Sequence, residues 1–201
     1  MMELLNKINH DGLAVLKSIL GARGDLGIDN YYEKRFLKDE FINDLDIKII
    51  SYIDKNISKE LSIFEPGSGY SQIPIALSIL GYKSFALEVR EDRYNGSLYA
   101  KKEFSRLYSN LDNLKIIRGR YPSDAPDCDI LLTRNFASTF NRENETCMIN
   151  TFKNFKYSFV DAKVFGFKRG EDDILHLLGK MNELGFSYKL CFDDYYLVEA
   201  L

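Results

Sequence analysis

Strand-like and helix-like segments alternate along most of this sequence, and the alternation stops near the C-terminal end. From residue 61 onward, short apolar runs are followed by longer segments with helical spacing, which predicts a parallel sheet with helices on both faces. The last two apolar runs, 187–192 and 195–201, are separated only by Asp193 and Asp194. Because a two-residue link can join only antiparallel neighbours, we expect an α/β fold. It would be a doubly wound, Rossmann-like, seven-stranded sheet, mostly parallel, with one antiparallel strand at the C-terminal hairpin.

The expected elements follow from the spacing of apolar residues and from capping residues. Strands are expected over residues 61–66, 83–89, 113–119, 128–134, 162–167, 187–192 and 195–201. Helices are expected over residues 11–20, 36–55, 71–80, 92–108 (with Asp92 as its N-cap), 141–155 and 171–184. Residues 1–58 would form a helical lid or cap over a core of residues 59–201, within one compact domain.

Composition narrows the class of protein. The chain has 201 residues, of which 45% are apolar and 28% charged, a balance typical of one folded domain. A net charge of −3 provides no global basic excess of the kind that marks nucleic-acid binders. Three scattered cysteines and two histidines give no ordinary zinc site, so we expect no metal. No apolar run or N-terminal segment suggests a membrane span or signal peptide, which favours a cytoplasmic protein in a reducing compartment.

A glycine-containing segment, FEPGSGYSQ at 64–72, lies between the first strand of the α/β part and its first helix. Gly67 and Gly69 let the backbone turn sharply and let a ligand approach with no Cβ in the way. Glu88 ends the next strand, 21 positions after Gly67, where a carboxylate can accept both hydroxyl protons of an adenosine ribose. Two glycines in a strand-to-helix turn are common by themselves. The strand context and Glu88 together favour an adenosine-type ligand.

Two residues beside the glycines distinguish between adenosine ligands. The dinucleotide pattern has a third glycine at position 72, where this chain has Gln72. Glu65 stands just before the first glycine, and its carboxylate would repel a pyrophosphate but attract an ammonium group. S-adenosylmethionine carries an ammonium and a sulfonium and no phosphate, so Glu65 favours this cofactor over nicotinamide dinucleotides. The alternative is that Glu65 is only a helix-capping or surface acid.

Residues 61–201 resemble a class I S-adenosylmethionine-dependent methyltransferase in strand order, in the acidic glycine loop and in the acidic end of the second strand. A weaker similarity is to the non-SET histone-lysine methyltransferase family (disruptor of telomeric silencing). That family reads D-L-G-S-G-x-G-Q, G-x-E, R-G-D-F and V-N-N-F-A-F. This chain reads EPGSGYSQ (65–72), ALE (86–88), RGRY (118–121) and TRNFAS (133–138), with YYE (31–33) similar to an upstream Y-G-E loop that caps the cofactor.

These resemblances imply a set of site residues. The implied cofactor-binding residues are Glu65, Gly67, Ser68, Gly69, Gln72, Glu88, Tyr121 and Asn135. Tyr121 would stack on adenine, and Tyr31, Arg134 and Asn135 would lie at the reacting end. For Tyr31 the alternative is simple packing under the lid.

Four of the departures from the family pattern bear on the function. Ser71 replaces a glycine, and Arg120 replaces an acid that contacts the adenine amino group. Arg134 and Ser138 replace residues that line the family's lysine channel. The cofactor half of the pattern is therefore better kept than the substrate half, and a lysine substrate does not follow from the resemblance.

Basic residues gather where the expected strands end. They are Arg90, Arg118, Arg120, Arg134, Lys168 and Arg169. One interpretation is an anionic acceptor, such as a carboxylate or phosphate metabolite, an acidic peptide or RNA, which Arg134 would contact through its planar fork. The other is ordinary surface charge paired with nearby acids. Methyl transfer from a sulfonium mainly requires alignment and exclusion of water, so we assign no catalytic base.

Three functions remain open at this stage. The first is S-adenosylmethionine-dependent methyl transfer to an unidentified acceptor, which includes a protein-lysine methyltransferase. The second is a cofactor-binding regulatory protein without turnover, suggested by Arg134 and Ser138 in the substrate motif. The third is a nicotinamide-dependent oxidoreductase, which Glu65 and Gln72 disfavour.

Overall fold

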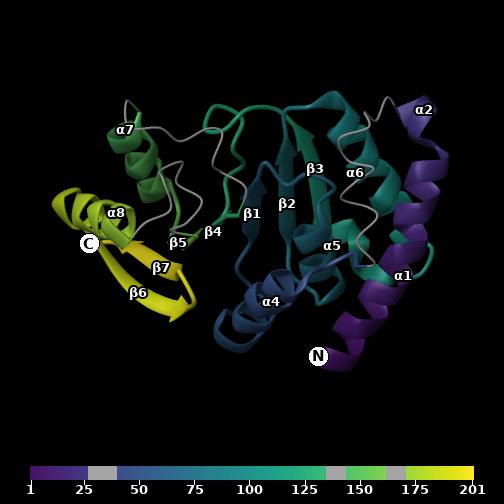
Figure 1. Cartoon of the computed structure of the whole chain (residues 1–201), viewed down its shortest axis with the longest axis horizontal. Helices are drawn as coiled ribbons and strands as arrows, with labels where there is room; N and C mark the ends of the chain where they lie inside the picture. The colour runs from purple at the N-terminus through teal and green to yellow at the C-terminus, as the bar shows by residue number, and fades with distance from the viewer. Residues whose placement is uncertain (27–39, 135–143, 162–170) are drawn as a thin grey trace.

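The computed structural model describes residues 1–26, 40–134, 144–161 and 171–201, and seven strands lie within these ranges. In chain order they are β1 (Ile63–Pro66), β2 (Ser84–Glu88), β3 (Leu114–Arg118), β4 (Ile130–Thr133), β5 (Tyr157–Asp161), β6 (Phe186–Phe192) and β7 (Tyr195–Ala200). They form one sheet in the order β3-β2-β1-β4-β5-β7-β6 (Figure 1). The first five strands are parallel, and β7 lies antiparallel between β5 and β6. The expected doubly wound sheet with an antiparallel C-terminal hairpin is thus confirmed.

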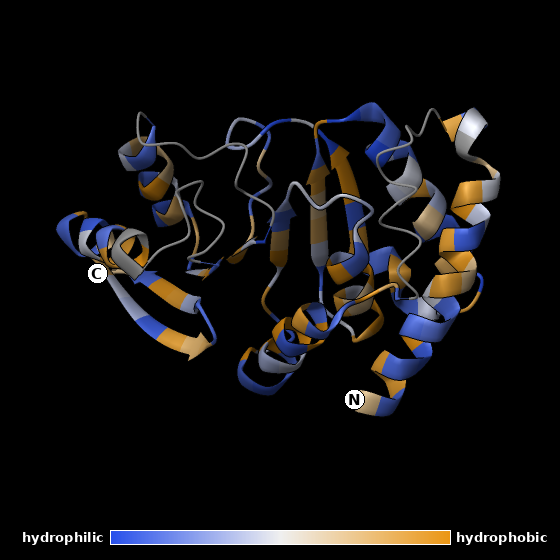
Figure 2. Ribbon diagram, viewed as in Figure 1, coloured by the Kyte–Doolittle hydropathy of each residue, from blue (hydrophilic) through white to orange (hydrophobic). Residues whose placement is uncertain are grey.

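The helices cover both faces of this sheet. They are α1 (Met2–Gly21), α2 (Arg23–Leu26), α4 (Asp44–Asn56), α5 (Gln72–Ile79), α6 (Glu91–Phe104), α7 (Glu145–Asn150) and α8 (Glu171–Glu183), with 3-10 turns η1 (Ser109–Asn113) and η2 (Thr151–Asn154). One buried cluster joins α1, α4, α5 and α6 to the sheet, and a second lies under α7, η2 and α8. Apolar residues concentrate on the central strands (Figure 2).

Several boundaries differ from those that the sequence pattern predicts. The expected fifth strand, 162–167, lies outside the described residues, and the strand in that place in the sheet is β5, five residues earlier in the chain. Helix α1 begins at Met2 rather than residue 11, because Leu5 and Ile8 extend its buried stripe. Asp92 does not cap α6. The N-cap is Arg90, and Asp92 lies in the first turn, where it accepts hydrogen bonds from the Arg90 guanidinium.

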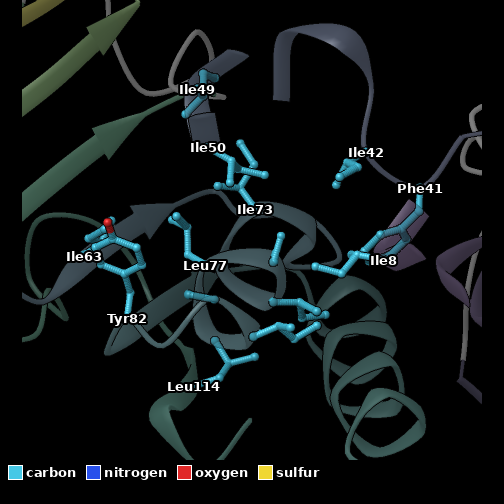
Figure 3. Packing of buried hydrophobic residues seen from close by; sticks show 14 of the residues in the cluster. Ile8, Phe41, Ile42, Ile49, Ile50, Ile63, Ile73, Leu77, Tyr82 and Leu114 are labelled. Carbon is cyan, nitrogen blue, oxygen red and sulfur yellow. The ribbon is translucent and has the colours of Figure 1, made fainter. Parts of the chain in front are cut away.

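Helix α4 begins later than the apolar spacing suggests because a capping box fixes its start. The Asn43 side chain accepts from the Asp46 backbone N–H, and the Asp46 carboxylate accepts from the Asn43 backbone N–H, both at 2.9 Å. Ile50 of this helix then lies beside Ile73 of α5, in the buried cluster to which Ile49 also belongs (Figure 3). The start of α4 is thereby held near the start of α5.

We expect Gly12→Ala to destabilise the protein. A Cβ on Gly12 of α1 would lie 2.2 Å from Cγ of Phe41, whose ring is buried, so the free energy of unfolding should fall by about 1–3 kcal/mol. Gly179→Ala on α8 is the matched control, since its Cβ would meet no described atom within 4 Å. The control should gain up to about 1 kcal/mol of helix propensity. Equal urea midpoints for the two variants would contradict the expected clash.

Candidate functional site

The loop between β1 and α5 has an unusual backbone at three alternate positions. Gly67, Gly69 and Ser71 all adopt positive φ, at 65°, 60° and 59°. The two glycines do so at little cost because they carry no Cβ. A Cβ added to Gly69 would meet no described atom within 4 Å. The loop therefore offers an open backbone surface at the carboxyl edge of the sheet, where the sequence places it.

Glu88, at the end of β2, is the buried acid that organises this loop. Its carboxylate accepts the backbone N–H of Gly69 at 3.1 Å and those of Val89 and Arg90 at 3.0 Å each. The Arg93 guanidinium lies 3.7 Å away, and Glu88 is only 2% exposed. The structure thus brings Glu88 and the glycine loop into direct contact. A carboxylate has about four lone-pair sites, so acceptor capacity for a ligand hydroxyl remains.

Glu65 and Gln72 flank the same loop. Glu65 lies at the end of β1 and is 2% exposed, which excludes the surface-acid interpretation. Gln72 begins α5, and its side-chain amide donates to the backbone oxygen of Phe41 at 2.9 Å. The backbone N–H groups of Phe41 and Ile42 in turn donate to the Asn9 side chain at 2.6 and 3.1 Å. The chain just before α4 is therefore fixed beside the loop.

A cluster of buried charges lies next to Glu65, at the ends of β1, β4 and β5. Arg134 follows β4 and pairs with Asp46 of α4 at 2.5 Å, with side chains 8% and 2% exposed. Tyr195 pairs in register with Asp161 at the end of β5. Burial raises the pKa of the Tyr195 hydroxyl. The negative charges of Asp161 and Glu65 raise this pKa further, whereas the positive charge of Arg134 lowers it. Because β1, β4 and β5 are neighbours in the sheet, Glu65, Arg134 and Asp161 lie at the ends of adjacent strands.

Sequence reasoning missed three members of this cluster. Asp161 stands at the end of a parallel strand, as Glu65 and Glu88 do, but the misplaced fifth strand concealed that position. Asp46 looks like an ordinary first-turn acid of α4. Tyr195 opens the last strand and has no local pattern that marks it.

The ion pair with Asp46 speaks against the expected contact between Arg134 and a substrate anion. That expectation required a guanidinium directed at the acceptor, and the structure directs it at a buried carboxylate of α4. Two other arginines of the basic group also meet acids, Arg90 with Asp92 at 2.9 Å and Arg118 with Glu91 at 3.2 Å. Lys168 and Arg169 lie outside the described residues. In the described part of the chain, these three guanidiniums follow the paired-charge interpretation.

Tyr121 follows β3 and is partly buried. Its ring centroid lies 6.1 Å from that of Phe64, and its hydroxyl forms a hydrogen bond with Thr151 of η2. Burial raises the pKa of the hydroxyl to about 12. In the same loop, the Asp124 carboxylate accepts a hydrogen bond from the backbone N–H of Arg120 at 2.7 Å. These contacts fix the loop after β3, and stacking of Tyr121 on adenine stays a prediction.

Part of the predicted site cannot be placed. Tyr31, Asn135 and Ser138 lie outside the described residues. Within the described ranges, no group of three or more His, Cys, Asp or Glu side chains could hold a metal ion. None of the helices in those ranges combines the length and apolar character that a membrane span requires.

Comparison with solved structures relates this fold to methyltransferases. Magnesium protoporphyrin IX methyltransferase from Synechocystis PCC 6803, with bound S-adenosylhomocysteine, matches with a TM-score of 0.58 at 13% identity, covering 78% of this chain and 82% of that one. A protein of Methanococcus maripaludis assigned as an S-adenosylmethionine-dependent methyltransferase matches at 0.54 and 18% identity, covering 78% and 87%. One from Pyrococcus horikoshii assigned as an RNA methyltransferase matches at 0.55 and 15% identity, covering 76% and 80%.

These matches show the fold. The chain has the Rossmann-like fold of S-adenosylmethionine-dependent methyltransferases, and the cyanobacterial enzyme was also crystallised with S-adenosylmethionine itself. No protein-family model matches the sequence, and no curated protein matches it. The three neighbours named above include a porphyrin enzyme and a protein assigned to RNA, so the fold leaves the acceptor undetermined.

Proposed function

We propose that this protein binds S-adenosylmethionine and transfers its methyl group to an acceptor. The observation that carries the proposal is the pair of buried acids, Glu65 and Glu88, at the ends of adjacent strands on either side of an open glycine loop. The buried carboxylate of Glu65, next to the last residue of β1, would repel the phosphates of a dinucleotide. It suits a ligand that carries an ammonium and a sulfonium and no phosphate.

Each described residue of the proposed site has a definite part. Glu88 would accept the ribose hydroxyls, and Glu65 would face the ammonium group. The backbone of Gly67, Ser68 and Gly69 would lie against the ligand, whose sulfonium supplies an activated methyl group and a neutral leaving group. Such a displacement mainly requires that the acceptor be aligned with the methyl group and that water be excluded, so no base is assigned.

The remaining parts of the proposal concern residues around this core. Gln72 and Tyr121 would close the cofactor site at its two ends, and Tyr31 and Asn135 would lie toward the reacting methyl group. Residues 1–58 would act as the lid. The hydrogen bonds of Phe41 to Asn9 and Gln72 support this role, because they attach the N-terminal part to the edge of the glycine loop.

Isothermal titration calorimetry tests cofactor choice. We expect S-adenosylmethionine to bind at micromolar concentration, about −8 kcal/mol, and NAD to bind far more weakly. Glu65→Gln removes the charge while keeping the shape, so it should weaken S-adenosylmethionine by about 10-fold or more, the scale of one charge-assisted hydrogen bond. Tight NAD binding with none of S-adenosylmethionine would overturn the proposal.

The acceptor needs a separate experiment. An S-adenosylhomocysteine product assay across carboxylate and phosphate metabolites, acidic peptides, RNA and lysine peptides separates an enzyme from a cofactor-binding regulatory protein. With Arg90, Arg118 and Arg134 all paired to acids, the case for an anionic acceptor now depends on the exposed Arg120 and on the undescribed Lys168 and Arg169. Turnover of a lysine peptide would favour the protein-lysine methyltransferase alternative.

A further inference from the structure

Ser71 occupies a backbone conformation that normally belongs to glycine. Its φ of 59° and ψ of 33° lie in the left-handed region, where the Cβ of an L-residue crowds the following carbonyl oxygen. Ser71 is also the N-cap position of α5, although its side chain makes no capping hydrogen bond. Something other than helix capping must therefore hold it in place.

A network of three buried serine hydroxyls provides the compensation. Ser71 Oγ donates to Ser97 Oγ at 3.0 Å, and Ser97 Oγ donates to the backbone oxygen of Gly69 at 2.8 Å. Ser68 Oγ lies 3.4 Å from Ser71 Oγ. Ser71 and Ser97 are fully buried and Ser68 is 4% exposed. Ser97 belongs to α6, so a helix that follows the next strand holds both the carbonyl of Gly69 and the side chain of Ser71.

The residue before Ser97 makes this approach possible. Gly96 lies in the middle of α6, where glycine is less favourable than alanine. A Cβ there would come within 2.1 Å of Cε1 of Tyr70. Tyr70 is the loop residue between Gly69 and Ser71, and its side chain is 2% exposed. Gly96 thus admits the Tyr70 ring against α6 while Ser97 bonds the backbone beside it.

We propose that Gly96 and Ser97 of α6 are positioning residues for the glycine loop. The hydroxyl network holds Ser71 in a backbone conformation that would otherwise require glycine at position 71. The inference rests on the proposed function for its ligand, S-adenosylmethionine. Neither residue need touch the ligand. They act by fixing the backbone of Gly69, whose carbonyl accepts from Ser97 and whose N–H donates to Glu88.

The first test compares two buried serines that each donate to a backbone carbonyl. Ser97→Ala should weaken S-adenosylmethionine by about 10-fold and speed hydrogen exchange of the Gly69 amide by a similar factor. Ser78→Ala is the control, because Ser78 is also fully buried and donates to the carbonyl of Asn110 at 3.1 Å, at the far end of α5. Its loss should lower stability comparably but change neither readout by more than about 2-fold. Equal effects from both variants would overturn the proposal.

The second test is a rescue. Glycine adopts positive φ without help, so Ser71→Gly added to Ser97→Ala should restore affinity and Gly69 amide protection to within about 3-fold of the parent protein. No recovery would show that the network does not serve the conformation of Ser71. The exchange measurement needs no ligand. If the parent protein fails to bind S-adenosylmethionine, the proposed function falls, while amide protection still decides the role of Ser97.

Discussion

Asp46→Asn should lower the free energy of unfolding by about 3–5 kcal/mol, the cost of leaving a buried guanidinium without its ion partner. Arg134 and Asp46 are 8% and 2% exposed and lie 2.5 Å apart. Asparagine keeps a side-chain oxygen that can accept the Asn43 N–H of the capping box, so the loss reports the ion pair rather than the helix cap. Urea denaturation followed by circular dichroism measures it.

Two controls define the origin of the loss. Lys48→Ala, on the same helix, removes an ion pair with Asp193 whose side chains are 55% and 49% exposed, and exposed pairs contribute at most about 1 kcal/mol. The double variant Asp46→Asn with Arg134→Met removes both charges and should recover much of the stability. If Asp46→Asn costs no more than Lys48→Ala, Arg134 is not committed to the fold, and contact with a substrate anion becomes tenable again.

This ion pair also bears on how the site is built. It joins the start of α4, which precedes β1, to the end of β4. The charge that sequence reasoning gave to a substrate is instead balanced within the protein. With Arg134 paired to Asp46, the other charges that act on the Tyr195 hydroxyl include two acids, Asp161 and Glu65. That balance suits the ammonium and sulfonium of the proposed cofactor better than it suits an anion.

The features that the sequence predicted correctly are local ones. Apolar spacing and turn residues indicate strands and helices, and the two-residue link between the last two strands requires an antiparallel hairpin. The positions of Glu65 and Glu88 at strand ends follow from the same logic, and their contact with a ligand at that edge stays a prediction. The sequence pattern predicts the fifth strand five residues too late, because the run at 162–167 is more apolar than Tyr157–Asp161, which forms β5.

The features that escaped prediction depend on contacts between distant parts of the chain. Asp46 and Arg134 lie far apart in the sequence and meet only in the folded chain, so no local pattern pairs them. Ser71 could be recognised as a departure from glycine, but its compensation by Ser97 appears only when α6 packs against the loop. A mid-helix glycine such as Gly96 is the one available signal, since it costs stability unless something must approach closely.

The largest effect on ligand binding should come from Glu88→Ala. The carboxylate holds the Gly69, Val89 and Arg90 amides and is proposed to accept the ribose hydroxyls. We expect cofactor affinity to fall by about 1.5–3 kcal/mol, or roughly 10- to 150-fold, the scale of hydrogen bonds to a charged group. Calorimetry with S-adenosylhomocysteine measures it. Glu91→Ala is the matched control, an acid three residues on that pairs with Arg118 at the surface and is 66% exposed.

Loss of affinity alone would not separate a ribose contact from a role in holding the loop, so the ligand must be varied together with the protein. If Glu88 bonds the ribose, removing the 2′-hydroxyl from S-adenosylhomocysteine should weaken binding by about 10-fold in the parent protein. The same removal should cost almost nothing in Glu88→Ala, because the partner of that hydroxyl is already absent. If the 2′-deoxy ligand loses the same affinity in both proteins, Glu88 serves only the loop amides. In that case the ribose must be held by another group, and the carboxylate at the end of β2 would position the glycine loop without a hydrogen bond to the ribose.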